Sequence, residues 1–197
     1  MPLINEHELH RVGDLIISKS YNFSKSADQI LIEASMAFKS VDGYDIFLSH
    51  SYRDAKEILG LKALLTDFGY TVYVDWIDDR QMDRTKVSTA TAERLRTRIG
   101  KCRCLMFVTS ANSPASVWMP WELGYADAKH GRVAVMPIAS GFAAVNDYHG
   151  QEYLALYPFV TKDHAKRTGV ETLFVNVTLT NYVGLSDWLK GQPPFQH

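Results

Sequence analysis

The stretch RCLMFVTSANSPASVWMPWELGYADAKHGRVAVMPI, residues 103–138, decides the fold. An apolar run over 103–110 is followed by a turn, by a segment with helical spacing that stops at Gly131, and by a second apolar run over 132–138. Continuous apolar runs are typical of strands that are covered on both faces, and a helix between two such strands is typical of a parallel sheet. The stretch therefore predicts a strand–helix–strand unit.

The same alternation extends along the chain in both directions. Short apolar runs alternate with segments of helical spacing, and one of these helices is predicted to stop at Gly69. The predicted strands cover 44–50, 71–76, 103–110, 132–138 and 171–177, and a closing helix covers 180–190. The sequence thus predicts an α/β fold in which an open, parallel, five-stranded sheet is flanked by helices.

Residues 1–41 lie outside this alternation. Apolar residues recur at helical spacing within 5–19 and 24–39, and Ser26 with Gln29 matches a capping box. We therefore predict a short helical N-terminal extension over 1–41, followed by the main domain over 42–197. The extension either packs on the domain or binds a partner.

The composition of the 197 residues, with 46% apolar and 22% charged residues, is ordinary for a globular protein. A net charge of −1 and scattered basic residues argue against binding to nucleic acid or to an anionic membrane. Two cysteines do not make a disulfide framework, and we find neither a signal peptide nor an apolar run of about 18 residues. We therefore predict a cytoplasmic protein without a membrane or nucleic-acid partner.

Glu122 stands beside two tryptophans in a region where ligands are expected, because parallel α/β sheets bind them beyond the carboxyl ends of the strands. Spacing alone leaves two interpretations open. Glu122 can lie in the first turn of its helix, where the helix dipole stabilises a negative charge by about 0.3–1 kcal/mol. Alternatively, it can be a reactive carboxylate, with Trp118 as an aromatic wall four residues earlier on the same helix face.

Other chemical motifs are missing from the sequence. The chain has no glycine-rich phosphate loop, and His50 has no second histidine at metal-ligand spacing. Cys102 and Cys104 lack further cysteines to complete a tetrahedral site and are predicted to be buried thiols. We therefore expect no metal and no cofactor.

Four segments occur in the order and spacing of one family. YDIFLSHSYRD, GYTVYVDWIDD, CLMFVTSANSPASVWMPWELGYA and GRVAVMPI resemble the signature segments of a TIR (Toll/interleukin-1 receptor) domain over 42–138. The resemblance implies a flavodoxin-like fold. The chain resembles the bacterial subgroup most, and it is similar in size to the stand-alone, signal-producing TIR component of Thoeris antiphage systems.

Enzymatic TIR domains cleave the nicotinamide–ribose bond of NAD and carry a Trp-x-x-x-Glu motif whose Glu is catalytic. Trp118 and Glu122 match this motif, so the resemblance implies that Glu122 is the catalytic residue. It also implies NAD as the substrate, a cyclic ADP-ribose isomer released with nicotinamide as a signal, self-association through TIR contacts, and a downstream effector that senses the product. The substrate-binding residues implied in the same way are His50, Ser51, Tyr52, Asp75, Trp76, Ser113 and Trp118.

Three other functions remain as alternatives. A TIR domain can be a non-enzymatic adaptor, although adaptors typically lack the glutamate found at position 122. An NAD-depleting hydrolase would make linear ADP-ribose, but such proteins usually carry a sensor domain longer than residues 1–41. A phosphoacceptor receiver has a similar order of strands and helices, but it needs an Asp where the third strand here ends in Thr109 and Ser110.

Overall fold

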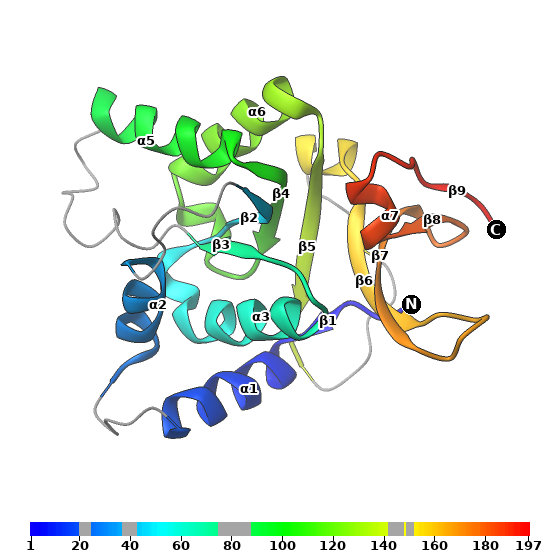
Figure 1. Ribbon diagram of the computed structural model, residues 1–197, viewed down its shortest axis with the longest axis horizontal. Helices are drawn as coiled ribbons and strands as arrows, with labels where there is room; N and C mark the ends of the chain where they lie inside the picture. The colour runs from blue at the N-terminus through cyan, green and yellow to red at the C-terminus, as the bar shows by residue number, and fades with distance from the viewer. Residues whose placement is uncertain (20–24, 37–42, 75–87, 142–147, 149–151) are drawn as a thin grey trace.

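The structure of the chain is a computed structural model that describes residues 1–19, 25–36, 43–74, 88–141, 148 and 152–197. One sheet runs through the molecule, with α3 against one face and α5 and α6 against the other (Figure 1). The strands are β1 (Ile4–Asn5), β2 (Tyr44–Ser49), β3 (Val72–Val74), β4 (Cys102–Thr109), β5 (Val133–Ala139), β6 (Phe159–His164), β7 (Glu171–Thr178), β8 (Asn181–Gly184) and β9 (Phe195–Gln196). The helices are α1 (Glu6–Lys19), α2 (Ala27–Met36), α3 (Ala55–Asp67), α5 (Thr89–Gly100), α6 (Trp118–His130) and α7 (Leu185–Leu189), with short 3₁₀ turns η1 (Tyr52–Asp54), η2 (Ser113–Ala115) and η3 (Glu152–Leu156).

The strand order confirms the predicted fold class. The strands follow the order β3-β2-β4-β5-β6-β7-β8-β9, and β1 pairs with β5. The five strands β3, β2, β4, β5 and β6 are parallel to one another. Numbered from β2, this is the order 2-1-3-4-5 of a flavodoxin-like fold.

The prediction for the last part of the sheet needs correction. The fifth parallel strand is β6, which the sequence did not predict, and the strand predicted over 171–177 lies in β7, which pairs antiparallel with β6. β6 escaped prediction because only its first half is apolar, while Lys162 and Asp163 are partly exposed. The predicted closing helix is divided between β8 and α7, which begins only at Leu185. The sheet of the described residues thus has nine strands instead of five.

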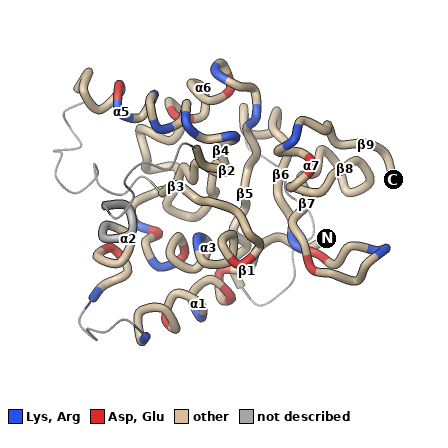
Figure 2. The backbone as a smooth tube through the Cα atoms, in the orientation of Figure 1, with Lys and Arg blue, Asp and Glu red and all other residues tan. Residues whose placement is uncertain are grey.

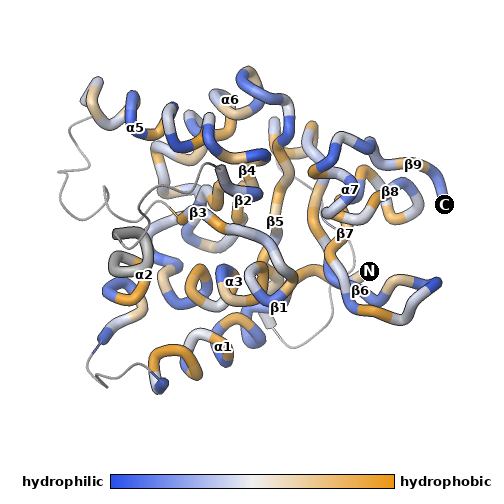
Figure 3. The backbone as a smooth tube through the Cα atoms, viewed as in Figure 1, coloured by the Kyte–Doolittle hydropathy of each residue, from blue (hydrophilic) through white to orange (hydrophobic). Residues whose placement is uncertain are grey.

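Side-chain alternation along the central strands divides the core into two layers. Ile46 and Leu48 of β2 belong to the layer under α3, whereas Phe47 belongs to the layer under α5 and α6. Apolar positions accordingly run along β5 and the neighbouring strands in Figure 3. Because side chains alternate, Ser49 at the end of β2 is on the same side as Phe47 and faces α6.

The first nineteen residues pack into the same core as the sheet. β1 pairs with the end of β5, with Ile4 opposite Ile138, and α1 packs along α3. Leu9 of α1 is fully buried. A Cβ added to Gly60 of α3 would lie 2.1 Å from the carbonyl oxygen of Leu9, so this helix contact depends on a glycine. The segment is helical, as predicted, and the domain boundary at residue 42 stays a prediction.

We expect Gly60→Ala to destabilise the protein. Alanine favours a helix interior over glycine by up to about 1 kcal/mol, but its Cβ would clash with the main chain of Leu9 and force α1 away from α3. Overpacking of this kind costs about 1–3 kcal/mol. Urea unfolding should show the loss. Gly124→Ala in α6 is the control, because its Cβ would meet open space; a Gly60→Ala protein as stable as the Gly124→Ala protein would contradict the prediction.

Charged residues of both signs occur along the helices. Figure 2 shows Lys and Arg interspersed with Asp and Glu along α1 and α5. None of the helices in the described ranges is both long and apolar enough to cross a membrane.

Candidate active site

Glu122 lies on the side of α6 that faces the sheet. The buried residues of α6 recur at helical spacing and form one stripe of Met119, Glu122, Leu123 and Ala126. Glu122 is only 7% exposed, and the hydroxyl of Ser49 donates a hydrogen bond of 2.5 Å to its Oε2 atom. A buried carboxylate is costly without hydrogen bonds, so the Ser49 hydroxyl offsets part of the cost of this position.

The interpretation of Glu122 as a first-turn carboxylate is wrong. α6 begins at Trp118, so Glu122 belongs to its second turn, and the first turn holds no acidic residue. The helix dipole acts mainly within the first turn. Glu122 is bonded instead to the end of β2, 73 residues away in the sequence. The tertiary contact with Ser49 therefore holds the Glu122 side chain at the edge of the sheet where the parallel strands end.

The two tryptophans of α6 have different surroundings. Trp118 lies one turn before Glu122 and is partly buried at the edge of the layer under α6. Its ring meets the ring of Trp121 edge-on, with centroids 5.6 Å apart. Trp121 stacks on Tyr125 and lies 5.5 Å from the guanidinium carbon of Arg96 on α5. Trp121 therefore joins α5 to α6, and Trp118 is the tryptophan on the Glu122 face of the helix.

Three residues after β2 make local hydrogen bonds. Nδ1 of His50 lies 2.9 Å from the carbonyl oxygen of Leu48, so this nitrogen carries the proton. Ser51 caps the turn η1 by accepting a hydrogen bond from the backbone N–H of Arg53. Tyr52 is 43% exposed, and its hydroxyl oxygen accepts a hydrogen bond from Nε of Arg53. The loop thus presents Tyr52 to solvent, while His50 and Ser51 shape its backbone.

Asp54 ties this loop to the loop that follows β4. It is 1% exposed, and its two carboxylate oxygens accept hydrogen bonds of 2.5 Å from Ser110 Oγ and 2.6 Å from Asn112 Nδ2. Burial raises the pKa of Asp54, the two hydrogen bonds lower it, and the charges of Glu57 and Glu6 raise it further, with a net rise. One buried carboxyl thereby fixes the relative positions of both loops at this edge of the sheet.

Ser113 belongs to the same edge but faces a separate cavity. Its hydroxyl donates to the carbonyl oxygen of Ser110 and accepts from the backbone N–H of Ser110. With Pro120 and Tyr148, it lines a cavity of about 480 Å³, whose walls do not include Glu122. Cavities of this size are typical of small-molecule binding sites.

Asp75 and Trp76 lie outside the described residues. Cys102 and Cys104 are buried free thiols, as predicted, and burial raises the pKa of Cys102 to about 12. Such thiols are inert, because the thiolate is the reactive form.

The sequence placed Ser49 in the polar cluster after the first predicted strand but gave it no role, and it did not point to Asp54; these two side chains organise the site. The sequence holds a signal for Ser49, because it is a polar residue at the last position of a buried strand. It lies two residues after Phe47, so both side chains point to the same face of the sheet. Asp54 had a weaker signal, as an acidic residue directly before a helix. Its actual partners, Ser110 and Asn112, lie more than fifty residues away, so no local pattern could identify them.

The fold agrees with the comparison to known families. A family model for the TIR domain matches residues 46–169. The match covers more than half of the chain, and the chain belongs to the TIR domain family.

The chain is also similar to individual proteins. The probable 3' cyclic ADP-D-ribose synthase ThsB' of Bacillus cereus (strain MSX-D12) is 44% identical over 192 residues, which cover 96% of this chain and 99% of the relative. The putative cyclic ADP-D-ribose synthase TIR2 of Cytobacillus dafuensis is 35% identical over 83 residues, which cover 42% of this chain and 22% of the relative. Among solved structures, the TIR domains of the activated Roq1 resistosome, which directly recognises the pathogen effector XopQ, match with 28% identity and a TM-score of 0.34, covering 48% of this chain and 56% of theirs.

Proposed function

We propose that this chain cleaves the nicotinamide–ribose bond of NAD and releases nicotinamide together with a cyclic ADP-ribose isomer. The observation that carries the proposal is the 44% identity, over nearly the whole of both chains, to a relative named as a probable 3' cyclic ADP-D-ribose synthase. The geometry of the candidate site also supports the proposal, because the carboxylate of Glu122, four residues after Trp118, is buried and hydrogen-bonded.

Glu122 is the catalytic residue of this proposal. When the bond between the ribose carbon and nicotinamide breaks, nicotinamide leaves as a neutral molecule with the bonding electrons. The ribose carbon then acquires oxocarbenium character, which a nearby carboxylate stabilises. The hydrogen bond from Ser49 orients one oxygen of Glu122 before the substrate arrives. A metal ion or a strong base has no necessary part in this step.

Cyclisation requires a nucleophile from the adenosine half of the same molecule. A ribose hydroxyl attacks the cationic carbon, forms the new carbon–oxygen bond and loses its proton. If water attacks instead, the product is linear ADP-ribose. We infer the 3' isomer for this chain from the name of the relative that matches its whole length. Trp118, partly buried beside the carboxylate, is placed in this proposal against the nicotinamide-bearing ribose, where it keeps water out.

Further residues contact the substrate in the same proposal. Tyr52 is partly exposed at the carboxyl edge of the sheet and contacts the substrate in this proposal, and His50 and Ser51 hold the loop that carries it. Ser113 lines the neighbouring cavity. The remaining contacts, proposed from the family resemblance alone, are Asp75 and Trp76.

The biological setting follows the family resemblance. We infer that the protein self-associates through TIR contacts and works in the cytoplasm without a cofactor. Its product acts as a signal in antiphage defence, sensed by a downstream effector. NAD is the substrate, and neither nucleic acid nor a membrane is part of the proposal.

The first test is to incubate the purified full chain with NAD, with and without a lysate of phage-infected cells, and to resolve the products by chromatography and mass spectrometry. We expect nicotinamide and a compound with the mass of cyclic ADP-ribose. Linear ADP-ribose as the main product would contradict the cyclase and favour a depleting hydrolase. An absence of NAD cleavage under both conditions would contradict the proposed enzymatic activity and favour a TIR adaptor.

A further inference from the structure

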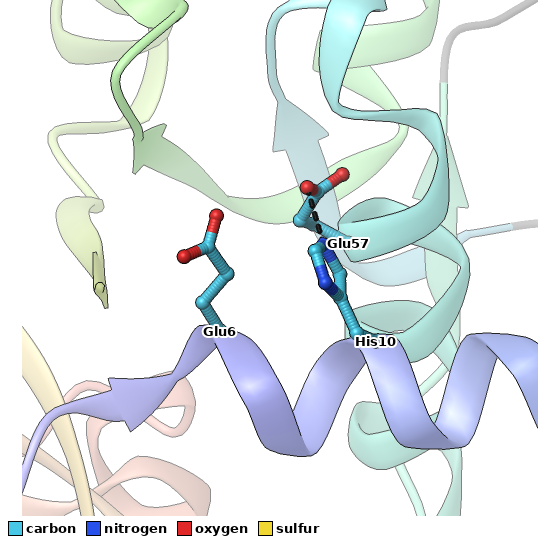
Figure 4. Close-up of side chains that lie close together, drawn as sticks. All are labelled: Glu6, His10 and Glu57. Atoms are coloured by element: carbon cyan, nitrogen blue, oxygen red, sulfur yellow. Dashed lines mark hydrogen bonds and ion pairs between the residues drawn. The ribbon is translucent and has the colours of Figure 1, made fainter. Parts of the chain in front are cut away.

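Three side chains that the proposed reaction does not use converge where α1 and α3 begin. One oxygen or nitrogen atom from each of Glu6, His10 and Glu57 lies within 4.8 Å of those of the other two, and all three side chains are partly buried. Figure 4 shows Glu6 and His10 projecting from α1 toward Glu57 on α3. Nε2 of His10 lies 2.6 Å from Oε1 of Glu57, whereas Glu6 makes no hydrogen bond or ion pair within the ranges described.

The cluster carries an excess of negative charge. The charges of both Glu6 and Glu57 reach a third carboxyl, that of buried Asp54, and raise its pKa. The nearby Lys56 is paired with Asp14, with 2.7 Å between its Nζ and Oδ1. Among the described residues, His10 pairs with Glu57 and lies close to Glu6, and a single imidazole cannot neutralise two carboxylates. Such a position favours an additional cation.

The backbone holds the three side chains in place. Glu6 and His10 are four residues apart and share one face of α1. Glu57 is in the first turn of α3. The two helices touch at Gly13 and Gly60, where an added Cβ would lie 2.9 Å from the carbonyl oxygen of Lys56 and 2.1 Å from that of Leu9. The distance between the helices is thus set by main-chain contact and does not depend on the cluster.

We propose that Glu6, His10 and Glu57 bind a divalent transition-metal ion, with Zn²⁺ preferred over Mg²⁺. One imidazole nitrogen and two carboxylate oxygens form a ligand set suited to Zn²⁺, and water completes the coordination. Ligand atoms around Zn²⁺ lie about 2.0–2.2 Å from the ion. Rotation of the Glu6 side chain, which has no hydrogen bond or ion pair to any described residue, therefore closes the site. Imidazole is a poor ligand for Mg²⁺, which prefers oxygen.

The ion would join α1 to α3, the helix that packs on one face of the sheet. It would bridge α1 and α3 through side chains and neutralise the charge next to Asp54, which ties the two loops of the candidate active site. The site is separate from Glu122, because α1 and α3 lie on the opposite face of the sheet from α6 (Figure 1). The proposal therefore stands or falls independently of NAD cleavage.

Calorimetric titration of the metal-free full chain with ZnCl₂ alone tests the proposal. We expect one saturable site, and a melting temperature that rises when ZnCl₂ is added. Glu6→Gln, His10→Ala and Glu57→Gln should each weaken Zn²⁺ binding at least about tenfold, which is the usual scale for loss of a ligand or its support. His7→Ala is the control, because His7 lies on the same helix but is exposed, and it should keep full affinity. MgCl₂ should bind at least about tenfold more weakly.

Several results would overturn the site. The first is an absence of saturable Zn²⁺ binding, and the second is full affinity in Glu6→Gln, since that would leave only an adventitious His10–Glu57 contact. Equal losses of Zn²⁺ affinity in His7→Ala and His10→Ala would point to nonspecific binding by surface histidines. Equal affinity for Mg²⁺ and Zn²⁺ would mean that the His10 imidazole is not a ligand of the ion. Within the described part of the chain Glu6 makes no hydrogen bond or ion pair, so the Glu6→Gln variant keeps the test valid even if His10→Ala or Glu57→Gln unfolds.

Discussion

Glu122→Gln is expected to reduce the rate of NAD cleavage at least about 100-fold, the scale of losing one preorganised electrostatic group in an active site. The glutamine amide has the shape of the carboxylate, and its oxygen can still accept the hydrogen bond from Ser49. It carries no negative charge, so it cannot stabilise an oxocarbenium-like ribose. The measurement is nicotinamide release under the condition in which the unmodified protein is active.

Two further variants separate charge from structure in this experiment. Ser49→Ala removes the hydrogen bond to Glu122 but keeps its charge, so we expect a smaller loss of activity than in Glu122→Gln. Glu93→Gln, at an exposed position on α5, should leave activity unchanged. The melting temperature of Glu122→Gln should stay near that of the unmodified protein, because a buried neutral amide costs less than a buried carboxylate. Comparable turnover in Glu122→Gln would remove Glu122 from the reaction.

Asp54→Asn is expected to cost both stability and activity. The amide offers one oxygen where the carboxylate offers two, so either Ser110 or Asn112 loses its acceptor. Leaving a buried donor unsatisfied costs about 1–3 kcal/mol of unfolding free energy. The loops after β2 and β4 then lose their connection, and misplacing a binding group by about 1 Å can cost roughly 100-fold in rate. We expect kcat/KM for NAD to fall between about tenfold and 100-fold.

Urea unfolding and steady-state kinetics, both measured well below the melting temperature, check this prediction. Asp67→Asn is the matched control at the exposed far end of α3, and it should change the unfolding free energy by less than about 0.5 kcal/mol. A destabilised Asp54→Asn protein with unchanged kcat/KM would mean that the hydrogen bonds of Asp54 support the fold without positioning the site.

The fold was largely predictable because continuous apolar runs mark strands that are buried on both faces. β2, β4 and β5 lie where those runs predicted them, and helices follow each of the first two. The prediction failed at β6, where Lys162 and Asp163 interrupt the apolar pattern. A strand of this kind is stabilised by its neighbours, because β6 pairs with β5 on one side and with β7 on the other. Neither pairing can be predicted from the residues of β6 alone.

The candidate site was predictable to the extent that its residues are close together in the chain. The spacing of Trp118 and Glu122 places both on one helix face, and the Trp-x-x-x-Glu motif of the family has the same spacing. The residues that hold the site are distant in sequence. Ser49 bonds Glu122 across 73 residues, and Asp54 reaches Ser110 across 56.

The sequence by itself thus determined the parallel α/β class, the helix that carries Glu122, and the family, because these depend on local periodicity and on motifs within single elements. Only the tertiary structure decided three other features: that Glu122 is held by Ser49 instead of by a helix terminus, that Asp54 joins two loops, and that His10 and Glu57 meet between α1 and α3. The physical reason is that hydrogen bonds and ion pairs depend on distance in space, and each of these pairs is brought within 3 Å only when helices fold back onto the sheet.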